Sequence, residues 1–245
     1  MPWRKDTRPY YVLVSELMLQ QTQVDRVIPK FEAFVGAFPT VQALATASLG
    51  EVLTLWSGLG YNRRAKFLHA AAQMVVQQFQ GEIPANLDDL VSLPGVGPNT
   101  AGAILAYSFN QPVVYIETNI RTVYFEHFFE GALNITDTQL REVVEATLDH
   151  EHPREWYWAL MDYGSWLKRN GRGSIDKSAH YKKQPALKGS LREARGIVLK
   201  ALAKAPHDRP TLLTLLDDDD RMNAAIDALL SEKLIVERHN RLALP

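Results

Sequence analysis

The segment best suited to chemistry is LPGVGPNTAGAI, residues 93–104, in which two glycines flank a single valine. Glycine permits a tight turn between two helices, and it leaves the backbone N–H groups at the positive end of the second helix unobstructed. A phosphate can approach such amides closely, which gives affinity for a DNA backbone without sequence preference. A plain packing corner between two helices is the alternative. The residues expected to contact phosphate here are Gly95, Val96, Gly97, Asn99 and Thr100.

The charges of the chain are segregated, although its formal net charge is only −1. Residues 163–190 hold seven lysines and arginines and one acid, whereas residues 126–155 hold eight acids and two arginines. Such a chain can present one positive face to a nucleic acid despite its near-zero net charge. Two solvated faces of opposite sign are the other interpretation of this pattern.

Cysteine is absent from the sequence, which excludes disulfides, thiolate zinc sites, cysteine nucleophiles and iron–sulfur clusters. No apolar run approaches the roughly 18 residues that span a bilayer, and the start, MPWRKDTRPY, leads into no signal-type apolar region. With 46% hydrophobic and 22% charged residues, the composition is that of an ordinary globular protein. We expect a cytoplasmic protein, associated with the nucleoid if it is bacterial.

The elements that must position these residues are mostly helices, because apolar residues recur three and four apart and alternating β-branched patterns are scarce. The expected helices span residues 11–27, 62–79, 87–93, 100–109, 118–129, 136–148 and 154–169. Residues 170–187 hold two glycines, a proline and most of the basic stretch, and they form the expected linker or wrapping loop. The pattern predicts an all-α protein.

A small separate unit is expected after this loop, at residues 189–245. Ser190 caps a helix through Ala203, a short helix follows Pro210, and a third helix spans residues 220–232 before a terminal hairpin. Three helices followed by a two-stranded wing form a winged-helix-like domain. The four acids at residues 217–220 would repel phosphate if the third helix entered a groove of DNA. Direct DNA contact and a packing or partner role, such as binding another repair protein, both stay open.

Five motifs within residues 2–184 resemble those of a known family. In chain order they are PWR (2–4), SELMLQQTQV (15–24), LWSGLGYNRRAKFLHAAA (55–72), LPGVGPNTAGAI (93–104) and MDYG (161–164). Their order and spacing resemble the helix-hairpin-helix (HhH-GPD) DNA glycosylases of the endonuclease III superfamily, and within it the MutY-type adenine glycosylases most. The resemblance implies a two-lobed helical glycosylase fold at residues 1–188, with duplex DNA crossing the cleft. A barrel lobe with the hairpin is expected at about 20–133, and residues 1–19 and 134–188 form the expected second lobe with the basic loop.

The resemblance also implies two catalytic carboxyls. Breaking the bond between a base and deoxyribose develops positive charge at C1′, which a carboxylate stabilises, while an acid assists the departure of the base. The family's first carboxylate is an aspartate in a segment like ILDGNVKRV, and the matching segment here, YIETNIRTV, places Glu117 at that position. Glutamate keeps the charge and adds one methylene, so catalysis and helix capping both stay open for it. Glu16 matches the second carboxyl, which protonates the departing purine when an apolar wall raises its pKa.

The remaining site residues also follow from the resemblance. An enzyme of this type flips the target base out of the duplex and fills the gap that is left. The residues expected to recognise bases or fill the gap are Gln20, Gln21, Asn119 and, as an intercalating wedge, Tyr61. Arg63 and Arg64 are expected to meet phosphates, unless they are only exposed solubilising charges. Lys168, Lys182 and Lys183 of the basic loop are also expected to hold backbone phosphate.

Three features of the family are missing. Bifunctional members attack C1′ with a hairpin lysine, and the matching residue here is Asn99, so we expect hydrolysis without AP-lyase chemistry. The four-cysteine loop of many members is replaced by the basic loop, so we expect no iron–sulfur cofactor and no side-chain metal site, although the family allows an alkali or magnesium ion at the hairpin. MutY-type members recognise 8-oxoguanine with a large C-terminal domain, and the 55 residues at this end are too short for one.

Together these inferences predict a monofunctional DNA glycosylase of base excision repair that hydrolyses a mispaired or damaged base from duplex DNA. Adenine opposite a damaged guanine is the first candidate substrate, and thymine or uracil opposite guanine is the second. The alternative is a lesion- or structure-binding protein that kept the glycosylase scaffold and lost most or all of its catalysis.

Overall fold

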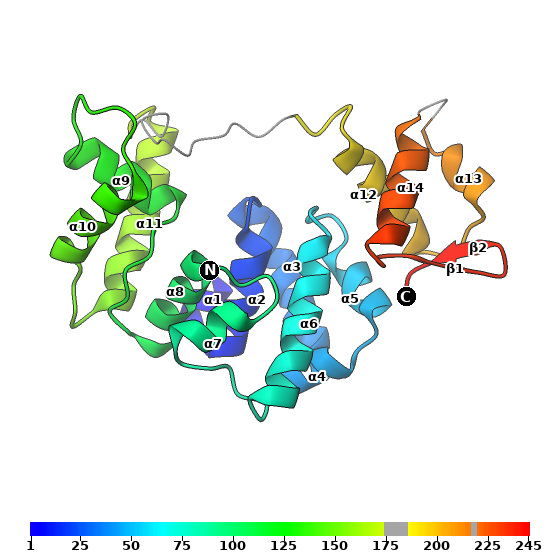
Figure 1. The fold of residues 1–245 in the computed structure, drawn as a ribbon, viewed down its shortest axis with the longest axis horizontal. Helices are drawn as coiled ribbons and strands as arrows, with labels where there is room; N and C mark the ends of the chain where they lie inside the picture. Colours follow the sequence, from blue (N-terminus) through cyan, green and yellow to red (C-terminus); the bar gives the residue numbers. More distant parts are fainter. Residues whose placement is uncertain (174–185, 217–219) are drawn as a thin grey trace.

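The computed structural model describes residues 1–173, 186–216 and 220–245, and over these residues it is helical except for one two-stranded sheet. The predicted all-α class is confirmed. Figure 1 shows three groups of elements, α1 to α8, then α9 to α11, then α12 to α14 with the sheet. Within the described ranges, no helix is long and apolar enough to cross a membrane.

In the first group, α2 is the central helix, because it packs on α3, α6 and α8 and buries most of its residues. Aromatic side chains fill the core beside it, where Phe34 makes edge-on contacts with Phe38 and Trp56. The group consists of α1 (Pro2–Lys5), α2 (Pro9–Leu19), α3 (Val24–Ala37), α4 (Val41–Thr46), α5 (Leu49–Trp56), α6 (Arg63–Gln78), α7 (Leu87–Ser92) and α8 (Pro98–Phe109).

In the second group, α9 packs closely along α11. A Cβ on Gly164 of α11 would lie 2.2 Å from the backbone oxygen of Asn119, so this approach requires a glycine, the last residue of the MDYG motif. The aspartate of that motif, Asp162, accepts two hydrogen bonds from the Arg4 guanidinium at 2.7 and 2.8 Å, which joins the group to the N-terminal PWR motif. The group consists of α9 (Thr118–His127), α10 (Asp137–Thr147) and α11 (Pro153–Arg169).

The third group has the predicted order of three helices and a hairpin. Its two strands pair antiparallel around a turn at His239 and Asn240, both with positive φ. Two backbone oxygens tie this C-terminal unit to the first group, since Gly50 N donates to Pro245 at 3.1 Å and Lys66 Nζ donates to Glu232 at 2.5 Å. The group consists of α12 (Leu191–Leu202), α13 (Arg209–Leu213), α14 (Arg221–Ser231), β1 (Val236–Arg238) and β2 (Arg241–Ala243).

One expectation about the elements differs from the structure. The helix expected at residues 11–27 is broken between α2 and α3, where Gln21 is left-handed at φ 56°, and no glycine or proline marks this break in the sequence. The contacts of the helices bear on the expected lobes of 20–133 and of 1–19 with 134–188. Because α2 packs on α8 whereas α9 packs on α11, residues 1–19 lie with the first group and α9 lies with the second.

Candidate active site

The glycine-rich segment forms the turn between α7 and α8, with Gly95 and Gly97 exposed on either side of buried Val96. Gly95 has φ +80°, and a Cβ there would lie 2.7 Å from the Phe67 side chain, so both the backbone and the packing require glycine. A Cβ on Gly97 would meet nothing within 4 Å, so the backbone next to the start of α8 is open. Val96 anchors the turn instead, since its side chain is buried and its N–H donates to the Leu93 carbonyl at 3.1 Å. The open, positive end of α8 is the geometry that a phosphate site needs.

Glu117 is the N-cap residue of α9. Its Oε1 accepts hydrogen bonds from the N–H groups of Asn119 and, at 3.2 Å, of Ile120. Shorter side chains are the usual N-caps, so the extra methylene of glutamate is accommodated by folding the side chain back onto its own helix. Burial raises the pKa of Glu117, whereas these N–H groups and the charge of Lys168 lower it. Both cap bonds use Oε1, so they do not occupy Oε2, and capping is compatible with catalysis.

Glu16, on α2, lies near enough to Glu117 for the two charges to interact. Burial, and secondly the negative charge of Glu117, raise the pKa of Glu16 to about 8. A pKa of about 8 favours the protonated form of Glu16 at neutral pH. The pKa of Glu117 is also raised by burial, but its N–H donors and the charge of Lys168 oppose that rise. Two carboxyls whose environments separate their pKa values in this way suit one acid and one anionic role.

A cation lies at this pair of carboxyls. Lys168, at the end of α11, donates from Nζ to Asn119 Oδ1 at 2.6 Å, and desolvation lowers its pKa while the charge of Glu117 raises it. The Asn119 amide also lies 3.9 Å from the Met161 sulfur. The structure thus places Lys168, expected among the phosphate contacts, beside the carboxylate, and it joins Lys168 to a residue expected to recognise bases.

Two buried tyrosines beside Glu16 were not among the expected site residues. Tyr107 on α8 and Tyr115 before α9 meet edge to face with ring centroids 6.2 Å apart. Burial raises the pKa of both hydroxyls, and the negative charge of Glu16 adds to each shift. These charge interactions place both tyrosines near the Glu16 carboxyl. The aromatic residue two positions before Glu117 is the signal in the sequence that could have found Tyr115.

The break between α2 and α3 carries the two glutamines expected at the gap. Gln20 Nε2 donates to Thr100 Oγ1 at 3.3 Å, which links it to the first turn of α8. Gln21 is exposed at the tip of the break. The broken helix therefore brings Gln20 to the glycine-rich turn and presents Gln21 outward.

Arg64 is buried and holds this break, which corrects the expectation that it meets phosphate. Its guanidinium donates to the backbone oxygens of Leu17 and Gln20, each at 2.6 Å, and of Gly60 at 3.2 Å. Burial lowers the pKa of Arg64 to about 10. Arg64 thus joins the glutamine segment to the turn that carries Tyr61.

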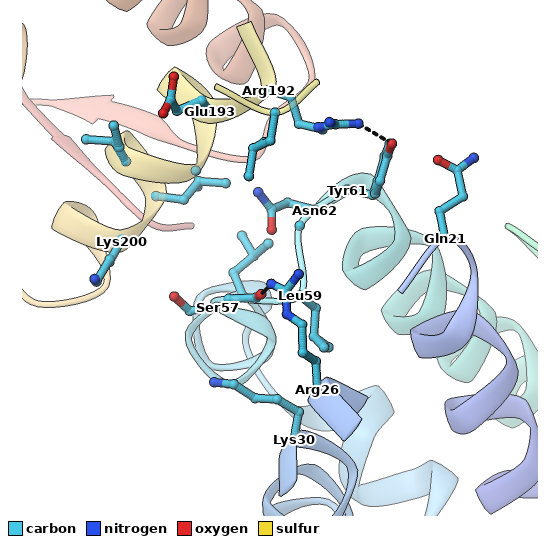
Figure 2. Close-up of a pocket in the computed structure, with 17 residues that line it drawn as sticks. Gln21, Arg26, Lys30, Ser57, Leu59, Tyr61, Asn62, Arg192, Glu193 and Lys200 are labelled. Atoms are coloured by element: carbon cyan, nitrogen blue, oxygen red, sulfur yellow. Dashed lines mark hydrogen bonds between the residues drawn. The ribbon is translucent and has the colours of Figure 1, made fainter. Parts of the chain in front are cut away.

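Tyr61, the expected wedge, follows Gly60 with φ 47°. Figure 2 shows Arg192 reaching from α12 to the Tyr61 hydroxyl, with Gln21 on the other side of the tyrosine. The Arg192 guanidinium also lies over the Tyr61 ring, 5.1 Å from its centroid. Arg63 is exposed and faces the same unit, with Nε 4.0 Å from the Glu232 carboxylate.

The other expected contacts can be placed only in part. Lys182 and Lys183 lie outside the described residues. Asn99, at the position of the lyase lysine, accepts the N–H of Ile116 at 3.3 Å and so ties α8 to the segment before Glu117. The described part of the chain has no group of three or more His, Asp or Glu residues that could hold a metal ion. A sequence without cysteine does not fit the iron–sulfur cluster of many relatives.

Comparisons with solved structures agree with this fold. A structure of a thermostable thymine-DNA glycosylase is similar with a TM-score of 0.63 at 24% identity, over 69% of this chain and 79% of that one. A trapped endonuclease III–DNA covalent intermediate is similar with a TM-score of 0.60 at 17% identity, over 75% of this chain and 80% of that one. At these identities the likeness shows the fold alone.

Proteins found by sequence comparison have higher sequence identity to this chain than these solved structures do. The adenine DNA glycosylase of Mycobacterium tuberculosis is 32% identical over 269 residues, which cover 100% of this chain and 88% of that protein. That of Homo sapiens is 37% identical over 177 residues, 67% of this chain and 32% of that protein. The chain spans 60% and 51% of the length of two relatives of the same name from Buchnera aphidicola, at 32% and 35% identity over 82% and 71% of this chain.

The family follows from the fold, the glycine-rich turn and these relatives together. Residues 14–148, more than half of the chain, match the model of the HhH-GPD superfamily base excision DNA repair protein. This range includes the carboxyls of α2 and α9, the glutamine break, the Tyr61 turn and the α7–α8 turn. The chain belongs to the HhH-GPD superfamily of base excision DNA repair proteins.

Proposed function

We propose that this protein is a monofunctional DNA glycosylase that removes adenine opposite a damaged guanine in duplex DNA. The observation that carries the proposal is the pair of Glu16 and Glu117, in which burial raises the pKa of both, while N–H donors and the charge of Lys168 oppose that rise at Glu117 alone. The relatives named adenine DNA glycosylase supply the choice of base.

The two carboxyls divide the chemistry between them. Glu16 gives its proton to a ring nitrogen of the extruded purine, so the electrons of the C1′–N bond leave with a neutral base. The Glu117 carboxylate stabilises the positive charge that develops at C1′ and orients the water that adds there. The proton that this water loses replaces the one that Glu16 gave to the base, so the site returns to its starting state. Asn99 stands where lyase members have their amine, so water is the nucleophile that completes the reaction.

The remaining parts of the site would hold the duplex. The open N-terminus of α8 suits a backbone phosphate, and exposed Gln21 and half-buried Tyr61 lie next to each other, where they could fill a gap in the base stack. Lys168 acts on Glu117 rather than on a phosphate, because its positive charge favours the ionised form of Glu117.

A substrate screen tests the proposal. Duplexes with adenine opposite 8-oxoguanine, adenine opposite guanine, and thymine or uracil opposite guanine are incubated with the protein and then cleaved at abasic sites with alkali. We expect product from the first duplex, at least about 100-fold less with Glu117→Gln, and no strand cleavage without alkali.

Each other result has a definite meaning. If only the thymine or uracil duplexes gave product, the excised base would be thymine or uracil and not adenine. Tight duplex binding without product from any substrate would make the protein a binder on the glycosylase scaffold. A borohydride-trapped covalent complex would contradict the monofunctional mechanism.

A further inference from the structure

A cavity of about 660 Å³ lies between the first group of helices and the C-terminal unit, beside Tyr61, the expected wedge. Figure 2 shows its walls, which are α3, the turn at residues 57–62 and α12. The Gly50 N–H bonds to the Pro245 oxygen and the Lys66 ammonium bonds to the Glu232 oxygen, so both parts of the chain are held together near the cavity. The cavity is therefore built by both parts of the chain.

The described lining of this cavity is strongly positive. Its charged side chains are Arg26, Lys30, Arg192, Lys200 and one acid, Glu193. The acid is already compensated, because Glu193 accepts hydrogen bonds from Arg221 at 3.3 Å and from the Gly189 N–H at 2.8 Å. Four cations around one cavity favour an anionic ligand.

The cavity is also joined to the wedge. Arg192 donates to the Tyr61 hydroxyl and covers its ring, while Gln21 lines the same cavity. A duplex whose base-stack gap is filled by Tyr61 would bring its sugar–phosphate backbone toward the Arg192 guanidinium, because Arg192 contacts Tyr61. A guanidinium binds phosphate through two parallel hydrogen bonds, which suits this position.

We propose that this cavity binds a backbone phosphate of duplex DNA next to the gap that Tyr61 fills, and that α12 supplies half of the site. The proposal rests on the proposed function for the position of the duplex. It assigns α12, rather than the acid-flanked third helix, as the part of the C-terminal unit that contacts DNA.

Gly196 gives a clean test because it lines the cavity and a Cβ there would meet nothing within 4 Å. Gly196→Glu adds a carboxylate to the cavity, and Gly196→Gln is the neutral control of nearly the same size. Binding is measured by fluorescence anisotropy with a duplex that carries a non-cleavable abasic analogue. We expect the Glu variant to bind about 10-fold more weakly than the Gln variant at about 100 mM salt.

The salt dependence of binding provides a second test. Lys200→Gln removes one cavity cation, and the slope of log affinity against log salt should fall by about 0.9, the value for one phosphate contact. Lys204→Gln, an exposed lysine just beyond α12 and outside the cavity, is the matched control and should leave the slope unchanged. Inorganic phosphate at constant ionic strength should not displace the duplex if the cavity needs a backbone phosphate.

Equal duplex affinity of the two Gly196 variants would overturn the proposal, because the cavity would then not contact DNA. Displacement by millimolar inorganic phosphate would reassign it to a small anion. Excision of adenine by the unmodified chain is measured separately, so a failed phosphate site and a failed glycosylase assignment give different results. A chain that binds no duplex at all would contradict both.

Discussion

Lys168 and Asn119 are joined by a hydrogen bond of 2.6 Å between Nζ and Oδ1, which holds an ammonium group beside Glu117. Glu117 is half-buried, and burial alone would favour its neutral form. The cation and the two N–H donors of α9 oppose that effect. The ionised carboxylate that the proposed chemistry needs therefore depends on a residue 51 positions away in the chain.

The Lys168→Met variant should need a higher pH for activity. Without the ammonium group the pKa of Glu117 rises, so the acidic limb of the single-turnover pH–rate profile moves to higher pH. A shift of one unit lowers the rate on that limb about 10-fold. Lys168→Arg, which keeps the charge, should restore most of the profile, and an unshifted limb in Lys168→Met would show that Lys168 does not act on Glu117.

The ionisation of Glu16 should set the upper pH limit of the activity. Its pKa of about 8 predicts a rate that falls as pH rises through about 8, because the acid is lost. Glu16→Gln should remove this limb and lower the rate by roughly 100-fold or more. A variant that keeps both the rate and the limb would exclude Glu16 as the acid.

Glu16 should also make folding stability depend on pH. Its folded pKa of about 8 lies above the ordinary value of 4.5, so the unfolded chain loses its proton first and stability falls as pH rises between these values. Glu16→Gln should flatten that fall and stabilise the protein by at least about 1 kcal/mol near pH 8. Thermal melts at several pH values measure this, and identical slopes in both proteins would argue against the raised pKa.

The two roles of Glu117 can be separated by comparing variants. Glu117→Ala removes the N-cap of α9 and should cost about 1 kcal/mol of folding free energy. Glu117→Gln keeps an oxygen that can accept the two cap bonds, so it should retain most of the stability while losing catalysis. Chemical denaturation of both variants checks the first statement, and equal destabilisation by Gln and Ala would mean that the charge itself holds the cap.

The close approach of α9 and α11 should make Gly164 intolerant of substitution. Gly164→Ala puts a methyl group 2.2 Å from the Asn119 oxygen, so the helices must separate, at a cost of about 1 to 3 kcal/mol. Gly36→Ala in α3 is the control, because a Cβ there meets nothing within 4 Å and alanine favours the helix. If both variants melt at the same temperature, the close packing of these helices is not as described.

Arg64 and its neighbour Arg63 should behave very differently. Arg64→Met leaves several buried carbonyls without their donor and should destabilise the protein by about 3 kcal/mol, whereas exposed Arg63→Met should have little effect. Denaturant titration compares the two. A mild effect of Arg64→Met would return Arg64 to the candidates for phosphate binding.

Much of this protein could be predicted from local sequence. The helical repeat of apolar residues, the glycines of the α7–α8 turn and the order of the motifs depend on neighbouring residues, and they were sufficient for the all-α class and the family. The absence of cysteine is likewise a property of composition alone.

Contacts between distant residues decided the rest. The break at Gln20 and Gln21 exists because Arg64 takes up the carbonyls that end α2, and the position of Lys168 depends on how α11 packs on α9 at Gly164. The contact of Arg192 with Tyr61 joins residues 131 positions apart. Spacing along a chain carries no information about such pairs, since only the packing of complete helices brings their side chains within hydrogen-bonding distance and removes the water between them.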